Sequence, residues 1–252
     1  MNIAVIGFGN IGRTFTSGVL NKCIFEKGNI FACDMAKEAC EYAKDVFGVN
    51  ASANINETIG SCDIVLWAIK GHVFYELAKE LDKNLLEGKT QISFMAGMSI
   101  ADIRNTLGVK GEVVRGMPTL AMKNNNAIIG YTPTKNTFLV KIFDSLGYAF
   151  EVEEDNIEKV TAYSSCGLGF AAYLLEAYKL AGIKMGFDEE TCEHITSQTF
   201  ANAIEMGNYA QTVKDVSTKG GATELGVNYM QEKKVSDTVC DTVRLAYEKF
   251  AK

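Results

Sequence analysis

The chain has 252 residues, a formal net charge of −6, and 47% apolar and 22% charged residues. This length accommodates one large domain or two small ones, and the composition excludes a wholly disordered chain and a disulfide-stabilised scaffold. The acidic balance argues against nucleic acid or an anionic membrane as a partner, because such partners are held by a general positive field.

The first half of the sequence alternates between strand and helix patterns. The predicted strands, short apolar runs rich in β-branched residues, are 2–6, 30–33, 49–53, 64–69, 91–94 and 113–117. The predicted helices are one that runs to about residue 22, then 37–47, 73–81 and 100–107. Repeated alternation of this kind is typical of a doubly wound parallel sheet with helices on both faces. We therefore assign residues 1–150 to an α/β domain of the Rossmann type.

The second half of the sequence is helical and more acidic. Apolar residues recur at helical spacing over residues 155–186, 188–207 and 223 to the end. Residues 151–252 hold 10 basic and 17 acidic side chains, whereas residues 1–150 hold 15 and 14. Long helices with broad apolar faces often bury those faces against a second subunit. The sequence therefore predicts that residues 151–252 form an all-helical dimerisation and substrate domain of a homodimer or higher homo-oligomer.

The seven cysteines are odd in number and show neither a CxxC pair nor a Cys/His spacing typical of metal ligands. Free thiols are typical of a reducing compartment. The sequence shows no signal-peptide pattern and no apolar run as long as a membrane span. We expect a cytoplasmic protein without a metal site, with neither a membrane nor nucleic acid as a partner.

A glycine-rich loop lies directly between the first predicted strand and the first predicted helix. Its residues are Gly7, Phe8, Gly9, Asn10, Ile11 and Gly12. In such a GxGxxG loop the first glycine permits the tight turn, the second lets a pyrophosphate approach the backbone, and the third lets the helix pack on the strand. The pyrophosphate then lies at the positive end of the helix. A glycine turn without a ligand is the alternative, but the strand–loop–helix context favours a dinucleotide-binding domain.

Asp34 lies at the end of the second predicted strand, 22 residues after Gly12. A carboxylate at this place accepts hydrogen bonds from the ribose hydroxyls of the adenosine half and repels a 2′-phosphate. The next residues supply no arginine for that phosphate, although Lys37 offers a positive charge. The sequence therefore favours NADH over NADPH as the NAD(P)H cofactor. The alternative role for Asp34 is to cap the next helix, and the two roles are compatible.

Six motifs, in order and over nearly the whole chain, resemble those of pyrroline-5-carboxylate reductases. They are the strand and glycine loop 3–12, Trp67-Ala68-Ile69-Lys70, residues 92–100 (ISFMAGMSI), residues 113–118 (VVRGMP), residues 160–164 (VTAYS) and Gly220-Gly221-Ala222-Thr223. Each motif alone is modest, but six in this order are specific. The chain is therefore identified as a divergent member of this family.

The chain also departs from the family's motifs. Gly71 stands where the family has proline, and residues 119–121 (TLA) replace its Asn-Thr-Pro. The family's S-G-S-G-P-A-Y becomes residues 164–170 (SSCGLGF), Lys219 replaces a proline, and Glu224 stands where an apolar residue is usual. These differences cluster where the resemblance places the nicotinamide end and the substrate. We therefore expect the fold to be shared and the pocket to differ.

The resemblance further implies roles for individual residues. Glycines in the turn 220–223 direct backbone N–H groups inward as a nest for a carboxylate, and the Thr223 hydroxyl orients the imine nitrogen and relays a proton from water. The implied substrate-binding residues are Gly220, Gly221, Ala222, Thr223, Met117 and Pro118. The implied cofactor-binding residues, besides the glycine loop and Asp34, are Ala68, Ile69, Lys70, Ala96 and Gly97. The alternatives are a flexible glycine turn and a strand-end Lys70 that projects into water.

Five further residues have two interpretations each. Lys219 either lies beside a substrate carboxylate or projects into solvent. Glu224 either binds a second basic group of the substrate or pairs with Lys219. His72 either contacts the cofactor or lies in a surface loop, and His194 is a packed or exposed helix residue. Cys166 is expected to pack rather than to act as a nucleophile, because no base lies near it in the sequence.

The predicted activity is NAD(P)H-dependent reduction of 1-pyrroline-5-carboxylate to L-proline, with hydride delivered from nicotinamide C4 to the imine carbon. By the resemblance, the 220–223 turn of one protomer completes the site of its partner. One alternative is a family oxidoreductase that acts on another cyclic imine or small carbonyl acid. The other is a non-catalytic, dinucleotide-binding regulatory paralogue.

Overall fold

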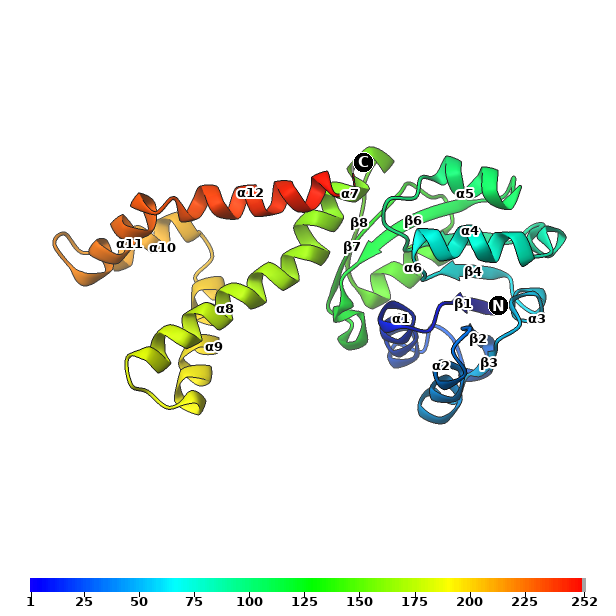
Figure 1. Cartoon of the computed structure of the whole chain (residues 1–252), viewed down its shortest axis with the longest axis horizontal. Helices are drawn as coiled ribbons and strands as arrows, with labels where there is room; N and C mark the ends of the chain where they lie inside the picture. Colours follow the sequence, from blue (N-terminus) through cyan, green and yellow to red (C-terminus); the bar gives the residue numbers. More distant parts are fainter. Residues whose placement is uncertain (251–252) are drawn as a thin grey trace. The chain divides into compact units, whose positions relative to one another are not determined.

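The computed structural model describes residues 1–250, which divide into a sheet unit and a helical unit (Figure 1). Among the described residues, the sheet unit comprises Met1–Ser165 with residues 247–250, and the helical unit comprises Cys166–Ala246. The division falls after Ser165 rather than near residue 150 because residues 157–165 pack on strands of the sheet.

One sheet of eight strands forms the centre of the sheet unit. The strands are β1 (Ile3–Ile6), β2 (Ile30–Cys33), β3 (Asn50–Ser52), β4 (Ile64–Trp67), β5 (Thr90–Ser93), β6 (Val113–Pro118), β7 (Ala127–Tyr131) and β8 (Gly147–Glu151). Their order is β3-β2-β1-β4-β5-β6-β7-β8, and every neighbouring pair is parallel except β6 and β7. The chain passes from β1 outward to β2 and β3, and then returns to β4 on the other side of β1. This reversal creates a topological switch point at the carboxyl ends of β1 and β4.

Helices cover both faces of this sheet (Figure 1). They are α1 (Asn10–Asn21), α2 (Lys37–Tyr42), α3 (Ile55–Gly60), α4 (Gly71–Glu80), α5 (Ile100–Leu107), α6 (Thr137–Leu146) and α7 (Ile157–Val160). Helices α1 and α6 pack with Ile3 and Val5 on one face, whereas α3, α4 and α5 pack with Ala4 and Ile6 on the other. Because successive side chains of a strand point to opposite faces, a strand covered on both sides is apolar at every position.

The helical unit contains five helices. They are α8 (Cys166–Lys184), α9 (Glu189–Glu205), α10 (Tyr209–Val216), α11 (Ala222–Glu232) and α12 (Val235–Glu248). Of the described residues of this unit, only Cys192 and Thr196 are buried. Tyr173 on α8 and Leu225 on α11 are 76% and 74% exposed. These helices therefore carry apolar faces that have no cover within one copy of the unit.

The α/β fold with a following helical region agrees with the sequence prediction, and several boundaries coincide. The predicted strand 30–33 and helix 100–107 match β2 and α5. The sequence patterns predict no element between residues 118 and 154, where the structure has β7, α6 and β8. The predicted helix from 223 to the end is two helices, because Lys234 adopts a left-handed φ of 52° between α11 and α12. Within residues 1–250, no helix is both long enough and apolar enough to cross a membrane.

Candidate functional site

A cavity of about 640 Å³ opens at the carboxyl ends of β1, β2, β4 and β5, at the switch point of the sheet. Its walls come from the five connections that follow β1, β2, β3, β4 and β5, which are far apart in the sequence but adjacent in the sheet. The residues that line it include Gly7, Gly9, Asn10, Ile11, Asp34, Met35, Ala68, Ile69, Lys70, Gly71, Phe94 and Ala96. In open α/β sheets this crevice is the place where ligands bind.

The glycine loop turns tightly beneath this cavity. Gly7 has a φ of +94°, and a Cβ on it would lie 2.6 Å from the carbonyl oxygen of Ala68. A Cβ on Gly12 would lie 2.1 Å from the carbonyl oxygen of Gly7, so α1 packs against the loop only because residue 12 lacks a side chain. A Cβ on Gly9, in contrast, would meet no atom of residues 1–250 within 4 Å. The loop therefore leaves open space at Gly9, on the cavity wall.

The amino end of α1 offers a binding place for an anion. Gly9 is its N-cap residue, and within the described chain no side chain caps this end and no acidic residue lies in the first turn. The free N–H groups and the helix dipole favour negative charge here. Together with the space at Gly9, this end of α1 fits the pyrophosphate of a dinucleotide.

Asp34 connects the end of β2 to the glycine loop. Its Oδ2 accepts a hydrogen bond from the Phe8 N–H at 2.8 Å, and its Oδ1 accepts one from the Ala36 N–H at 3.0 Å. Ala36 occupies the N-cap position of α2, so Asp34 orders the loop rather than capping that helix. Each carboxylate oxygen has a second lone pair, and Asp34 lines the cavity. The carboxylate therefore retains acceptor capacity for ribose hydroxyls.

Two basic residues lie near this end of the site. Lys37 is paired with Glu41 at 3.5 Å and lies outside the cavity lining. The Arg13 Nε donates to the Phe8 carbonyl oxygen at 2.8 Å, and its guanidinium lies 4.2 Å from the centre of the Tyr42 ring. Arg13 is not among the predicted site residues, because it belongs to none of the motifs. Its position directly after the glycine loop is the sequence feature that could have identified it.

The carboxyl end of β4 forms the wall opposite the glycine loop. Ala68, Ile69 and Lys70 all line the cavity, and Lys70 is exposed. A Cβ on Gly71, the residue that replaces the family's proline, would lie 3.2 Å from the Met98 sulfur. His72 is exposed and is not part of the lining.

Some predicted site residues lie outside the cavity lining. Phe8 and Gly12 are buried under the loop, and Gly97 follows the lining residue Ala96 with a left-handed φ of +71°. Met117 and Pro118 are buried on β6. Ser165, the last residue of the short π-helix Thr161–Ser165 that precedes α8, donates a hydrogen bond to the Pro118 carbonyl oxygen at 3.0 Å.

The turn at residues 220–223 belongs to the helical unit and begins α11. Gly220 has a left-handed φ of +72°, and its N–H donates a hydrogen bond to Glu224 Oε2 at 2.7 Å. A shallow pocket of about 250 Å³ lies here, and the Thr223 side chain is exposed beside it. The carboxylate of Glu224 therefore binds the backbone N–H of Gly220 and is not paired with Lys219.

Burial favours the neutral form of two thiols, Cys33 and Cys166. Burial raises the pKa of Cys33, on the cavity wall, to about 11, and raises that of Cys166 as well. A neutral thiol is a poor nucleophile, so neither residue has the character of a catalytic cysteine. Among residues 1–250 no group of three or more His, Cys, Asp or Glu side chains is arranged to hold a metal ion.

The doubly wound sheet, the glycine loop and the cavity at the switch point together define a dinucleotide-binding protein of the Rossmann class. Residues 2–97 match the family model described as "NADP oxidoreductase coenzyme F420-dependent", and residues 154–252 match "Pyrroline-5-carboxylate reductase dimerisation". Over residues 154–252 the chain is therefore similar to the dimerisation region of pyrroline-5-carboxylate reductases.

The chain is similar over nearly its whole length to curated relatives and to solved structures. The chain is 27% identical to the pyrroline-5-carboxylate reductase of Staphylococcus saprophyticus, over 99% of this chain and 96% of that protein. It superposes with a TM-score of 0.90 on Plasmodium falciparum pyrroline carboxylate reductase with NADP bound, at 24% identity over 99% and 97% of the two chains. The Streptococcus pyogenes 1-pyrroline-5-carboxylate reductase gives the same TM-score at 20% identity, over 99% and 98% of the two chains.

Proposed function

We propose that this chain reduces 1-pyrroline-5-carboxylate to L-proline with NAD(P)H. The observation that carries the proposal is the full-length similarity to curated proteins that are named for this reaction. The cavity at the switch point supports it, because the reaction requires a place for a dinucleotide beside a small anionic substrate.

The residues of the cavity have distinct tasks toward the cofactor. The amino end of α1 and the open backbone at Gly9 bind the pyrophosphate, and the Asp34 carboxylate accepts hydrogen bonds from the adenosine ribose. A negative charge at residue 34 disfavours a 2′-phosphate, so we propose a preference for NADH. When bound, the dihydronicotinamide supplies the hydride of the reaction.

The substrate is held by the turn at residues 220–223. Its backbone N–H groups bind the carboxylate, and the Thr223 hydroxyl hydrogen-bonds the imine nitrogen. The imine carbon gains a hydride while the nitrogen gains a proton, which Thr223 relays from water because a threonine hydroxyl is itself a weak acid. Most of the rate enhancement then comes from holding the imine carbon and the hydride donor together.

We propose that the active form is a homodimer in which the 220–223 turn of one protomer completes the partner's site. The apolar faces of the helical unit support this assembly, because exposed apolar area of this extent is typical of subunit interfaces. The seven free cysteines are consistent with a reducing compartment, for which we propose the cytoplasm.

The test is rescue of a proline auxotroph by the intact gene, together with turnover of the purified protein on pyrroline carboxylate with NADH and with NADPH. Rescue and turnover are the expected results. Dinucleotide binding without turnover on any cyclic imine, and without rescue, would instead identify a non-catalytic regulatory paralogue.

A second candidate is a reductase for another cyclic imine. The observation that favours it concerns Glu224. The carboxylate of Glu224 accepts a hydrogen bond from the Gly220 N–H, and this N–H belongs to the turn that we assign to the carboxylate of the substrate. Assays with a panel of cyclic imines that differ in the carboxylate and in added amino groups distinguish the two. A higher kcat/KM for an imine with a second basic group would select the second candidate.

A further inference from the structure

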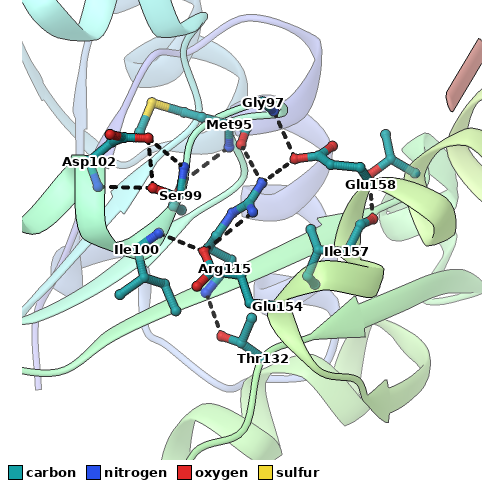
Figure 2. Close-up of polar contacts among 12 residues, drawn as sticks. Met95, Gly97, Ser99, Ile100, Asp102, Arg115, Thr132, Glu154, Ile157 and Glu158 are labelled. Atoms are coloured by element: carbon teal, nitrogen blue, oxygen red, sulfur yellow. Dashed lines mark hydrogen bonds and ion pairs between the residues drawn. The ribbon is translucent and has the colours of Figure 1, made fainter. Parts of the chain in front are cut away.

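A buried charge cluster lies next to the cavity, on residues to which the proposed reaction assigns no role (Figure 2). Its centre is Arg115 on β6, whose side chain is only 4% exposed. The guanidinium binds Glu158 Oε1 at 2.5 Å through one nitrogen and Glu154 Oε1 at 3.5 Å through the other. It also donates to the Met95 carbonyl oxygen at 3.4 Å. A charge buried to this degree requires such partners, because isolated burial is strongly unfavourable.

The same two carboxylates hold the loop between β5 and α5. Glu158 Oε1 accepts the Gly97 N–H at 2.9 Å, and Glu154 Oε1 accepts the Ile100 N–H at 2.6 Å. Each oxygen is therefore shared between the guanidinium of Arg115 and a backbone group of the loop, as Figure 2 shows. Including the Met95 contact, the cluster fixes residues 95–100 at three points along the backbone.

Ala96 is the loop residue that lies on the cavity wall, between the fixed groups at Met95 and Gly97. It follows β5, whereas Asp34 follows β2, and the strand order places β1 and β4 between them. At about 4.8 Å per strand spacing, the two ends of the cavity are roughly 14 Å apart. If the adenosine ribose binds at Asp34 and the pyrophosphate at α1, the nicotinamide end extends toward Ala96.

We propose that Arg115, Glu154 and Glu158 are positioning residues that hold the 95–100 loop in the shape required by the nicotinamide half of the cofactor. The cluster acts through the loop backbone and does not touch the reacting atoms. This inference rests on the dinucleotide site of the proposed function, but not on the identity of the imine.

The test compares dissociation constants for NADH and for ADP-ribose, which lacks the nicotinamide, in the full-length protein. Glu158→Gln keeps the side-chain size and removes the charge that Arg115 and Gly97 share. We expect NADH affinity to fall roughly tenfold, the ratio that corresponds to the loss of one charge-assisted contact, while ADP-ribose affinity stays unchanged. Glu153→Gln, an exposed neighbour whose side chain caps no helix, is the matched control.

Further variants keep the outcome decisive. Arg115→Lys retains the charge but loses the forked geometry, so it should restore part of the NADH affinity that Arg115→Met loses. If Glu158→Gln does not fold, Glu154→Gln takes its place, because its side chain is 35% exposed and the substitution weakens only the Ile100 contact and the longer, 3.5 Å contact with Arg115. Equal changes, or no change, in both dissociation constants would overturn the positioning role. Because binding is measured without an imine, failure of the proposed reaction would be seen separately, in the turnover assays.

Discussion

The Asp34 carboxylate has two tasks that a single substitution can separate. It accepts hydrogen bonds from the Phe8 and Ala36 N–H groups, and it lines the cavity at the place where we propose that the adenosine ribose binds. Asp34→Asn keeps an acceptor for one N–H group and removes the charge, whereas Asp34→Ala removes both. We expect Asp34→Asn to shift the ratio of kcat/KM for NADH and NADPH toward NADPH by about tenfold, because the repulsion of a 2′-phosphate is lost. Steady-state kinetics with both cofactors measures this ratio, and an unchanged ratio would contradict the NADH preference.

Substitutions of Thr223 test the proposed transfer of a proton to the imine nitrogen. Its hydroxyl is exposed at the start of α11, so its removal leaves the fold intact. We expect Thr223→Ala to lower kcat on pyrroline carboxylate by about 10²-fold, the lower end of the range for proton-transfer groups, with little change in NADH affinity. Thr223→Ser retains a hydroxyl and should keep most of the activity. Wild-type turnover in the alanine variant would exclude the assigned role.

At the scale of one element, the glycine loop provides a matched pair of substitutions. A Cβ on Gly12 would lie 2.1 Å from the Gly7 carbonyl oxygen, whereas a Cβ on Gly9 would face open space. We expect Gly12→Ala to lower the free energy of unfolding by about 2 kcal/mol or more, because the backbone has to shift. Gly9→Ala should retain the wild-type Tm but weaken dinucleotide binding, because the methyl group occupies the place of the pyrophosphate.

Thermal unfolding and equilibrium binding of NADH distinguish the two effects. The two variants add the same methyl group to the same loop, so each serves as the control for the other. Loss of stability in Gly9→Ala, or unchanged NADH affinity in that variant, would contradict the proposed pyrophosphate site.

At the scale of the whole molecule, a substitution on helix α8 tests the proposed dimer. It exposes apolar side chains on several sides, which is typical of a helix that is buried in an assembly. We expect Tyr173→Asp to shift the protein from dimer to monomer and to abolish turnover, because a charge would be buried without a partner. Light scattering coupled to size-exclusion chromatography measures the mass. Tyr148→Asp, at a comparably exposed tyrosine on β8, is the control and should remain dimeric.

The central strands and the glycine loop could be predicted from the sequence because their signals are local. Strands β1 and β4 are buried on both faces and are therefore apolar at consecutive positions, and the glycines follow β1 directly. Strands β7 and β8 lack such an uninterrupted signal, since Ile128 within β7 is exposed and no position of β8 is fully buried. Their place in the sheet is decided by pairing with β6, which local pattern does not specify.

The sequence by itself therefore determined the α/β class, the dinucleotide loop, the acid at residue 34 and the helical second half, because each depends on neighbours within one turn or strand. Only the tertiary structure decided which groups face one another. Arg115 lies within a recognisable motif, yet its partners are 39 and 43 residues away, and they meet only because the sheet brings β6, the β5–α5 loop and α7 together. Long-range contacts of this kind are set by packing and by the need to pair buried charge, which no local pattern encodes.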